Sequence, residues 1–187
     1  MKNLNFISDE ILSNHLQNRI KKTVKKGTIL QRKGDSKMKA FLVTKGLLRS
    51  YFIDEKGNEH VFMFAPENWL ITDVNLISNN TDSEAVLYID ALENSEIEII
   101  DEFILQHISQ LPNNILFDQI IKLINRLNSL QNRVLLLLSA TAKERYKDFV
   151  NTYPQILQRV PQKMIASYLG IAPQTLSVLR RSKSNIL

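Results

Sequence analysis

The chain has 187 residues, 44% of them hydrophobic, which is enough to bury the core of one ordinary domain and a small second one. It contains no cysteine, which excludes disulfides, thiolate-bound zinc, cysteine-ligated iron–sulfur clusters and a cysteine nucleophile. Apolar runs such as 135–138 are too short to cross a bilayer, and the first twenty residues show no signal peptide. These features predict a cytoplasmic protein.

The net charge of +5 is distributed very unevenly along the chain. Residues 1–56 carry 13 Lys and Arg against 5 acids, residues 57–121 carry 12 acids and no Lys or Arg, and residues 122–187 carry 11 bases against 2 acids. This asymmetry is typical of a polyanion-binding end attached to a non-binding body, although a solvated basic face explains the charge alone equally well. The acid-free end contains the bases Arg159, Lys163, Arg180, Arg181 and Lys183.

The first hundred residues predict one short helix followed by strands. Residues 8–18 are expected to be helical, with Ser8 as the N-cap. From residue 25 to about residue 100, short apolar runs alternate with turn residues, most clearly at Asp54–Asn58, and this pattern indicates a β-sandwich or β-roll. The expected strands cover residues 28–30, 40–43, 47–53, 60–64, 85–89 and 97–100.

After Pro112 the hydrophobic period becomes that of a helix. Seven apolar residues follow one another at alternating spacings of four and three, which makes three heptads of a and d positions. Further apolar residues such as Ile121 and Leu135 widen this surface, so we expect packing both on the β domain and against a second copy; packing on its own domain alone is the other explanation. The expected dimer seam consists of Leu116, Ile120, Leu123, Leu127, Leu130, Val134 and Leu137.

The segment 162–181 predicts two helices that cross around a tight turn at Gly170, with Ala166 small enough for a close approach. Because the segment is also basic and acid-free, it predicts DNA binding rather than an ordinary helical hairpin, with residues 173–181 in the major groove. Gln174 is the candidate for a base-edge contact, and Val178 would touch at most a thymine methyl. The other expected DNA-binding residues are Gln162, Lys163, Thr175, Ser177, Arg180 and Arg181.

Several short motifs occur in a specific order along the chain, among them Lys33-Gly34-Asp35, Asp54-Glu55-Lys56-Gly57-Asn58-Glu59-His60, Glu144-Arg145-Tyr146 and Ile165-Ala166-Ser167-Tyr168-Leu169-Gly170-Ile171. Through them, from about residue 8 to residue 182, the chain resembles the cyclic-AMP receptor/fumarate–nitrate regulator (Crp/Fnr) family, particularly its Bacteroidetes-type branch. The resemblance implies an α+β fold with an N-terminal cyclic-nucleotide-binding-like β-roll (jelly roll), a long dimerisation helix and a C-terminal helix-turn-helix. The corresponding domains are residues 1–111, 112–138 and 139–187.

The chain departs from the nucleotide-binding members of that family. Those members neutralise the cyclic phosphate with the arginine of an Arg-Ser or Arg-Thr pair, whereas the corresponding stretch here reads Ser83-Glu84-Ala85-Val86. No Lys or Arg in 57–121 replaces that arginine, so cyclic AMP is not expected to bind. Asp73 could still accept from a ribose hydroxyl, and Trp69 is either a core aromatic or a stacking residue. The candidate effector pocket consists of Trp69, Thr72 and Asp73.

The favoured function is a DNA-binding transcription regulator of the Crp/Fnr type. Its expected partners are double-stranded DNA, a second copy of the chain, RNA polymerase and an effector that the sequence does not identify, with no membrane partner. The alternative is a small-molecule-binding module with a helix-turn-helix that no longer reads DNA, because Ala172 and Val178 stand where the family has an N-cap Ser or Thr and an arginine. No catalytic constellation is present, and His15, His60 and His107 lack metal-ligand spacing, so no enzyme activity, cofactor or metal is expected.

Overall fold

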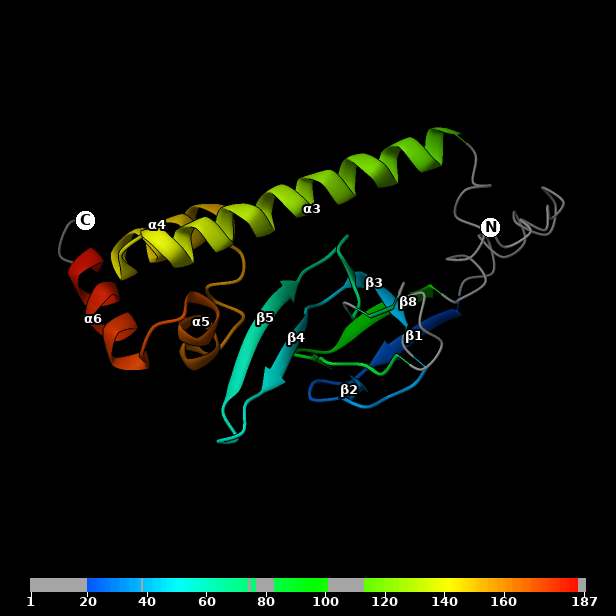
Figure 1. Ribbon diagram of the computed structural model, residues 1–187, viewed down its shortest axis with the longest axis horizontal. Helices are drawn as coiled ribbons and strands as arrows, with labels where there is room; N and C mark the ends of the chain where they lie inside the picture. The colour runs from blue at the N-terminus through cyan, green and yellow to red at the C-terminus, as the bar shows by residue number, and fades with distance from the viewer. Residues whose placement is uncertain (1–19, 38, 74, 77–82, 101–112, 185–187) are drawn as a thin grey trace, which may run out of the picture. The chain divides into compact units, whose positions relative to one another are not determined.

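The computed structural model describes residues 20–37, 39–73, 75–76, 83–100 and 113–184 of the chain (Figure 1). The helix predicted over residues 8–18 lies outside these residues. No helix in the described ranges is long and apolar enough to cross a membrane. The chain divides into two compact units, one with the residues through Ser50 and Ala65–Leu123, the other with Tyr51–Phe64 and Ile124–Leu187.

The first sheet has four antiparallel strands, in the order β1 (Ile20–Val24), β8 (Ser95–Ile100), β3 (Ala40–Lys45) and β6 (Leu70–Ile71). β8 pairs with β1 on one side and with β3 on the other, so that Ile99 is opposite Ile20 in β1 and Phe41 in β3. The turn after β3 requires glycine, because Gly46 has a φ of 97° and a Cβ there would collide with Ser95. A side chain at position 46 would therefore disrupt the turn that follows β3.

The second sheet has the strand order β2 (Ile29–Gln31), β7 (Tyr88–Ala91), β4 (Leu48–Ile53) and β5 (Glu59–Ala65), which leaves β5 at an edge. The buried pair Arg49–Asp90 joins β4 to β7 through two parallel hydrogen bonds, Nε to Oδ1 at 2.9 Å and a terminal nitrogen to Oδ2 at 3.0 Å. The tip between β4 and β5 closes where the N–H of Asp54 donates to the carbonyl of Asn58 at 3.0 Å. β4 and β5 therefore form the hairpin predicted at Asp54–Asn58.

Four helices follow in the described part of the chain: α3 (Asn113–Ser139), α4 (Ala142–Thr152), α5 (Gln162–Leu169) and α6 (Pro173–Ser184). The long helix predicted after Pro112 is confirmed by α3, and the two C-terminal helices by α5 and α6. Within the second unit, α4, α5 and α6 contact one another around Phe149, Ile165 and Leu176, which are all buried. The expected α+β order, a β-roll followed by helices, is confirmed.

The strands differ from the prediction at three places. β1 was not predicted, because Val24 is its only buried residue and the strand shows no alternation. β6 is only two residues long, too short for a periodic signal. The expected strand 85–89 begins its pairing only at Tyr88, because the N–H groups of Val86 and Leu87 donate to the carboxylate of Asp73 instead of a neighbouring strand.

Candidate functional site

The C-terminal helix pair is held around Gly170, which adopts the left-handed conformation (φ 65°, ψ 39°). The N–H of Gly170 donates to the carbonyl of Ser167 at 3.1 Å, and that of Ile171 to the carbonyl of Ala166 at 3.0 Å, so the last carbonyls of α5 are satisfied and the helix ends there. Ile165, Ala166 and Leu176 are fully buried between the helices. The predicted helix–turn–helix segment is thus built with its predicted glycine at the turn.

The outer side of α6 presents a stripe of exposed residues at helical spacing. Gln174, Val178 and Arg181 lie four and three positions apart, all three are exposed, and Val178 keeps 64% of its surface open. Thr175 on α6 and Gln162 and Lys163 on α5 are exposed as well. Ser177 and Arg180 are half-buried, and the hydroxyl of Ser177 donates to the carbonyl of Pro173 at 3.1 Å. The eight candidate DNA-binding residues therefore comprise six exposed and two half-buried ones.

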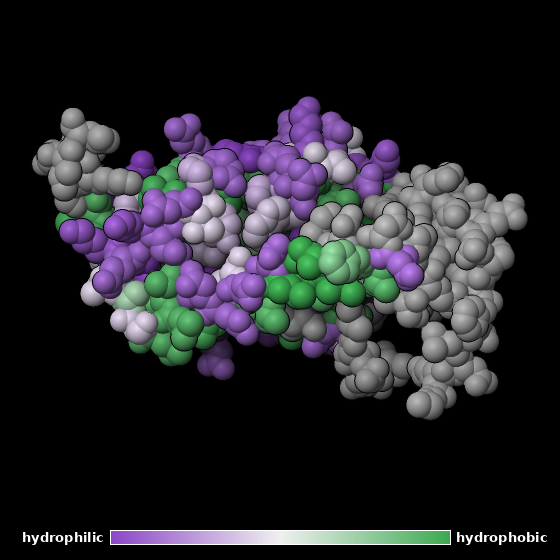
Figure 2. All heavy atoms as spheres, turned by 90° about the horizontal axis from the view of Figure 1, so that it is seen from above, coloured by the Kyte–Doolittle hydropathy of each residue, from purple (hydrophilic) through white to green (hydrophobic). Residues whose placement is uncertain are grey.

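The apolar seam of α3 is open to solvent in the single chain. Six of its seven residues are exposed, including Leu123 at 66% and Leu127 at 52%, while Leu116 is half-buried. Figure 2 shows one face of the molecule, on which green apolar surface lies among purple polar surface. Exposed leucines at heptad spacing are unfavourable in water, and such a seam is typical of a helix that packs against another apolar surface.

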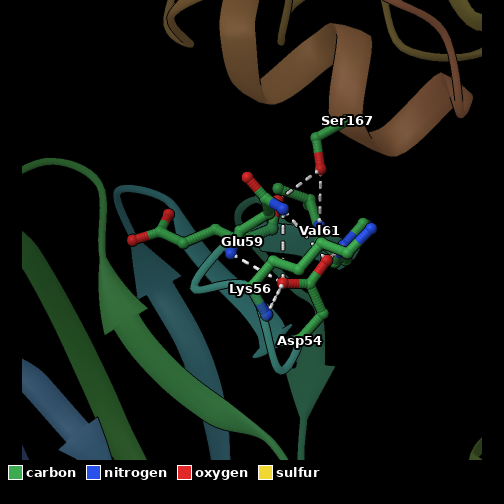
Figure 3. Close-up of polar contacts among 7 residues, drawn as sticks. Asp54, Lys56, Glu59, Val61 and Ser167 are labelled. Carbon is green, nitrogen blue, oxygen red and sulfur yellow. Dashed lines mark hydrogen bonds and ion pairs between the residues drawn. The ribbon is translucent and has the colours of Figure 1, made fainter.

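A contact that the sequence did not predict joins the β4–β5 hairpin to α5 (Figure 3). The hydroxyl of Ser167 accepts a hydrogen bond from the N–H of Val61 at 2.9 Å and donates one to the carbonyl of Glu59 at 3.0 Å. From α3, Arg133 donates to the carbonyls of Phe62, of Val61 at 3.2 Å and of Tyr168 at 2.9 Å. We call the side chains of Ser167 and Arg133, the backbone of residues 59–62 and the carbonyl of Tyr168 together the hairpin clasp.

An aromatic cluster lies next to the hairpin clasp in the same unit. Phe149 of α4 is buried, and its ring centre lies 5.4 Å from that of Tyr168 and 5.6 Å from that of Tyr153. Phe64, at the end of β5, has its ring centre 5.4 Å from that of Tyr168. These rings pack at distances typical of favourable aromatic pairs, so Tyr168 contributes both to the core and to the hairpin clasp.

In the first unit, Asp73 is buried and its carboxylate serves the chain itself. Oδ2 accepts from the N–H groups of Val86 at 3.1 Å and Leu87 at 2.8 Å and from Nε2 of Gln31 at 3.0 Å, and Oδ1 accepts from the N–H of Asn75 at 3.0 Å. The carboxylate of Asp73 thus joins its own loop to Gln31 and to the segment 86–87. Its hydrogen-bonding capacity is largely used by these four donors.

The other two residues of the candidate effector pocket, Trp69 and Thr72, are half-buried, and the hydroxyl of Thr72 lies 3.4 Å from the carbonyl of Lys39 that it donates to. An open cleft of about 340 Å³ in the same unit is lined by other residues, among them Gln31, Lys37, Lys39 and Phe41. None of the three candidate pocket residues lines that cleft. Through its bond to Asp73, Gln31 links the cleft to the candidate pocket.

Comparison with known proteins identifies relatives over most of the chain, although no family model matches it. The fumarate and nitrate reduction regulatory protein of Yersinia pestis is 31% identical over 182 residues, which cover 89% of this chain and 70% of the relative. The fold is similar to that of FixK2 from Bradyrhizobium japonicum, with a TM-score of 0.73, 16% identity and coverage of 89% and 85% of the two chains. It is equally similar to a CooA mutant from Carboxydothermus hydrogenoformans, with a TM-score of 0.73, 19% identity and coverage of 97% and 86%.

These relatives and similar structures agree with the order of elements described above: a β-roll, a long helix and a helix pair. Crp/Fnr proteins bind DNA as dimers, respond to effectors and are not enzymes. The chain therefore belongs to the Crp/Fnr family, as a transcription regulator with a cyclic-nucleotide-binding-like sensor domain.

Proposed function

We propose that this regulator binds double-stranded DNA by placing α6 in the major groove. The observation that carries the proposal is the exposed stripe of Gln174, Val178 and Arg181 on a helix pair whose sequence from Arg159 onward contains no acidic residue. A helix with basic and amide side chains on its outer face suits a polyanion, and the shared core of α5 and α6 leaves that face uncovered.

Within this interface the residues have different roles. Gln174, near the start of α6, pairs with a base edge, because an amide can bond adenine in two places, and Val178 would touch at most a thymine methyl. The others contact phosphates, which position the helix without reading the sequence. The phosphate-contacting residues in this proposal are Gln162, Lys163, Thr175, Ser177, Arg180 and Arg181.

We further propose that the protein acts as a homodimer through the seam of α3, from Leu116 to Leu137. The proposal is supported by the exposure of Leu123, Leu127 and their heptad neighbours, which a second copy of the same helix would cover. The domain assignment that goes with it is residues 1–111 for the sensor, 112–138 for the dimerisation helix and 139–187 for DNA binding. RNA polymerase would be a further partner, and the cytoplasm is the compartment in which the regulator meets DNA.

For the sensor we propose an effector other than a cyclic nucleotide. The amides of Val86 and Leu87 and the carboxylate of Asp73 already bond one another, and Arg49 is committed to Asp90. An added phosphate would meet the buried charge of Asp73 without an arginine to compensate it. Trp69, Thr72 and Asp73 stay the candidate effector residues, with Asp73 holding the segment in place. We also propose, from the sequence motifs quoted above, that the chain belongs to the Bacteroidetes-type branch of the family.

The test is a mobility-shift titration of mixed genomic DNA fragments with purified protein at low and at moderate salt. A DNA-binding regulator retards the DNA at low salt, retards it less at moderate salt, and selects particular fragments. A protein that leaves all fragments unshifted at micromolar concentration in low salt would instead be the module with a helix-turn-helix that no longer reads DNA. The alanine at position 172, where the family has an N-cap Ser or Thr, and the exposed Val178 would then explain the loss.

A further inference from the structure

The tip of the β4–β5 hairpin is organised around the carboxylate of Asp54. The carboxylate of Asp54 accepts from the N–H groups of Lys56 at 2.9 Å and Asn58 at 2.8 Å and lies 2.8 Å from Nε2 of His60. The ring of His60 stacks on that of Phe52 across the hairpin, with centres 4.8 Å apart. An Asp that satisfies the turn in this way restricts the hairpin to one conformation, so the hairpin can serve as a fixed support.

α5 contacts this support at the unpaired edge of β5. An edge strand exposes backbone N–H and carbonyl groups that need partners. The single hydroxyl of Ser167 supplies both a donor and an acceptor, bonding the carbonyl of Glu59 and the N–H of Val61, as a neighbouring strand would (Figure 3). The contact joins residues that are 108 and 106 positions apart, so it is a tertiary contact and not a local turn.

Arg133 completes the hairpin clasp from α3. Its guanidinium reaches the carbonyls of Val61 and Phe62 on β5 and that of Tyr168 on α5, and its central carbon lies 4.0 Å from the centre of the Tyr168 ring. One planar cation therefore connects three elements, and its fork geometry requires that they keep one relative orientation. Lysine, with a single point charge, could not meet this requirement.

We propose that Ser167 and Arg133 are positioning residues for DNA binding: they hold α5, and through the turn at Gly170 also α6, in the orientation that docks on DNA. The inference rests on the DNA-binding function proposed above. The hairpin clasp uses the side of α5 that carries Ser167 and Tyr168, while Gln174 and Arg181 on α6 stay exposed, so the clasped arrangement leaves the proposed DNA-binding face open. Since β4 begins in the first unit of the chain, the hairpin is also a covalent connection from the sensor to the site.

A pair of variants of nearly equal shape isolates the hydroxyl: Ser167→Thr keeps it and Ser167→Val replaces it by a methyl group. Ser139→Ala is the control, because the Ser139 hydroxyl bonds only within its own helix, to the carbonyl of Leu135 at 2.8 Å. Each protein is titrated with a selected DNA fragment over a salt series, and the hydrogen exchange of the Val61 amide is followed by NMR. Ser167→Ala removes the hydroxyl without adding volume and gives the same comparison if valine perturbs the fold.

We expect the valine variant to bind DNA about tenfold more weakly, because two hydrogen bonds that preorganise the helix pair are lost. Its salt slope should equal that of the wild type, since no phosphate contact is removed. The Val61 amide should exchange faster, while the threonine variant and Ser139→Ala bind like the wild type. Equal affinity of the valine and threonine variants despite faster Val61 exchange, tighter binding by the valine variant, or a salt slope lower by one would each overturn the proposal. A wild type that binds no DNA would instead refute the proposed function.

Discussion

The guanidinium of Arg133 stacks on the ring of Tyr168 and also donates a hydrogen bond to the carbonyl of the same residue, at 2.9 Å. Burial lowers the pKa of Arg133, because desolvation disfavours its charge, and it raises the pKa of Tyr168, whose phenol therefore stays neutral. An aromatic face and three carbonyl oxygens thus compensate a largely buried cation. This arrangement makes the second unit sensitive to the shape of the cation and not only to its charge.

Replacement of Arg133 by lysine should therefore destabilise the protein although the charge is kept. We expect a loss of about 1–3 kcal/mol in the free energy of unfolding, because the hydrogen bonds to Val61, Phe62 and Tyr168 cannot all be made by one ammonium group. Urea unfolding followed by circular dichroism measures it. The matched control is Arg181→Lys on the exposed side of α6, for which a change below about 0.5 kcal/mol is expected. Equal stability of Arg133→Lys and the wild type would contradict this account of the hairpin clasp.

The hairpin tip should have its own pH dependence, set by Asp54. Hydrogen bonds from His60 first, and then from Asn58, hold the pKa of Asp54 well below its usual value of 3.8. A carboxylate with a lowered folded-state pKa adds stability above its unfolded pKa and loses it as the pH falls through the folded value. The stability difference between the wild type and Asp54→Asn should therefore shrink as the pH falls below about pH 4.

Denaturant unfolding at a series of pH values checks this prediction, with His60→Gln as the companion variant. Loss of the His60 contact removes the largest cause of the lowered pKa, so the contribution of Asp54 should then disappear at a higher pH. A difference between the wild type and Asp54→Asn that is unchanged at pH 3, or that grows on acidification, is incompatible with the structure of the tip.

Cyclic nucleotides should not bind to the sensor. Asp73 occupies the N–H groups of Val86 and Leu87, and Arg49 is buried in its pair with Asp90, so neither these two amides nor Arg49 is free to bind a phosphate. Calorimetric titration with millimolar cyclic AMP and cyclic GMP should give only heats of dilution. A micromolar isotherm for either nucleotide would show that another base takes up the phosphate.

Dimerisation through α3 should be lost when a charge is placed in the seam. Leu127→Asp would bury an unpaired carboxylate at the interface and should shift the protein toward monomer in analytical ultracentrifugation. Asn128→Asp adds the same charge at the neighbouring position, off the seam and exposed, and should leave the dimer intact. A wild type that sediments as a monomer at micromolar concentration would refute the interface.

The order of the elements could be predicted from the sequence because each has a local signal. The heptads from Leu116 to Leu137 predicted α3, and Gly170 predicted the turn between α5 and α6. α4 has a local signal as well, the Thr141–Glu144 capping box, in which the N–H of Thr141 donates to the Glu144 carboxylate at 2.8 Å.

The contacts that unite distant segments had no such signal. Ser167 looks like an ordinary helix residue in the sequence, and its partners on β5 become visible only after the chain has folded. The sequence suggests Asp73 as an acceptor for a ribose hydroxyl of an effector, but no pattern in it indicates that the chain's own Val86, Leu87 and Gln31 donate to this carboxylate. Tertiary packing selects these partners, and the periodicity of the sequence does not indicate which distant residues will pack together.

The central claim, that α6 reads DNA, is tested most directly by the salt dependence of binding for Arg181→Ala and Gln174→Ala on a selected fragment and on random DNA. We predict that Arg181→Ala weakens binding to both DNAs alike and lowers the log–log salt slope by about one, because one phosphate contact is lost. Gln174→Ala should keep the slope and lose about 1–3 kcal/mol on the selected fragment only, since it removes a base contact. Unchanged binding by both variants on both DNAs would contradict the placement of α6 in the groove.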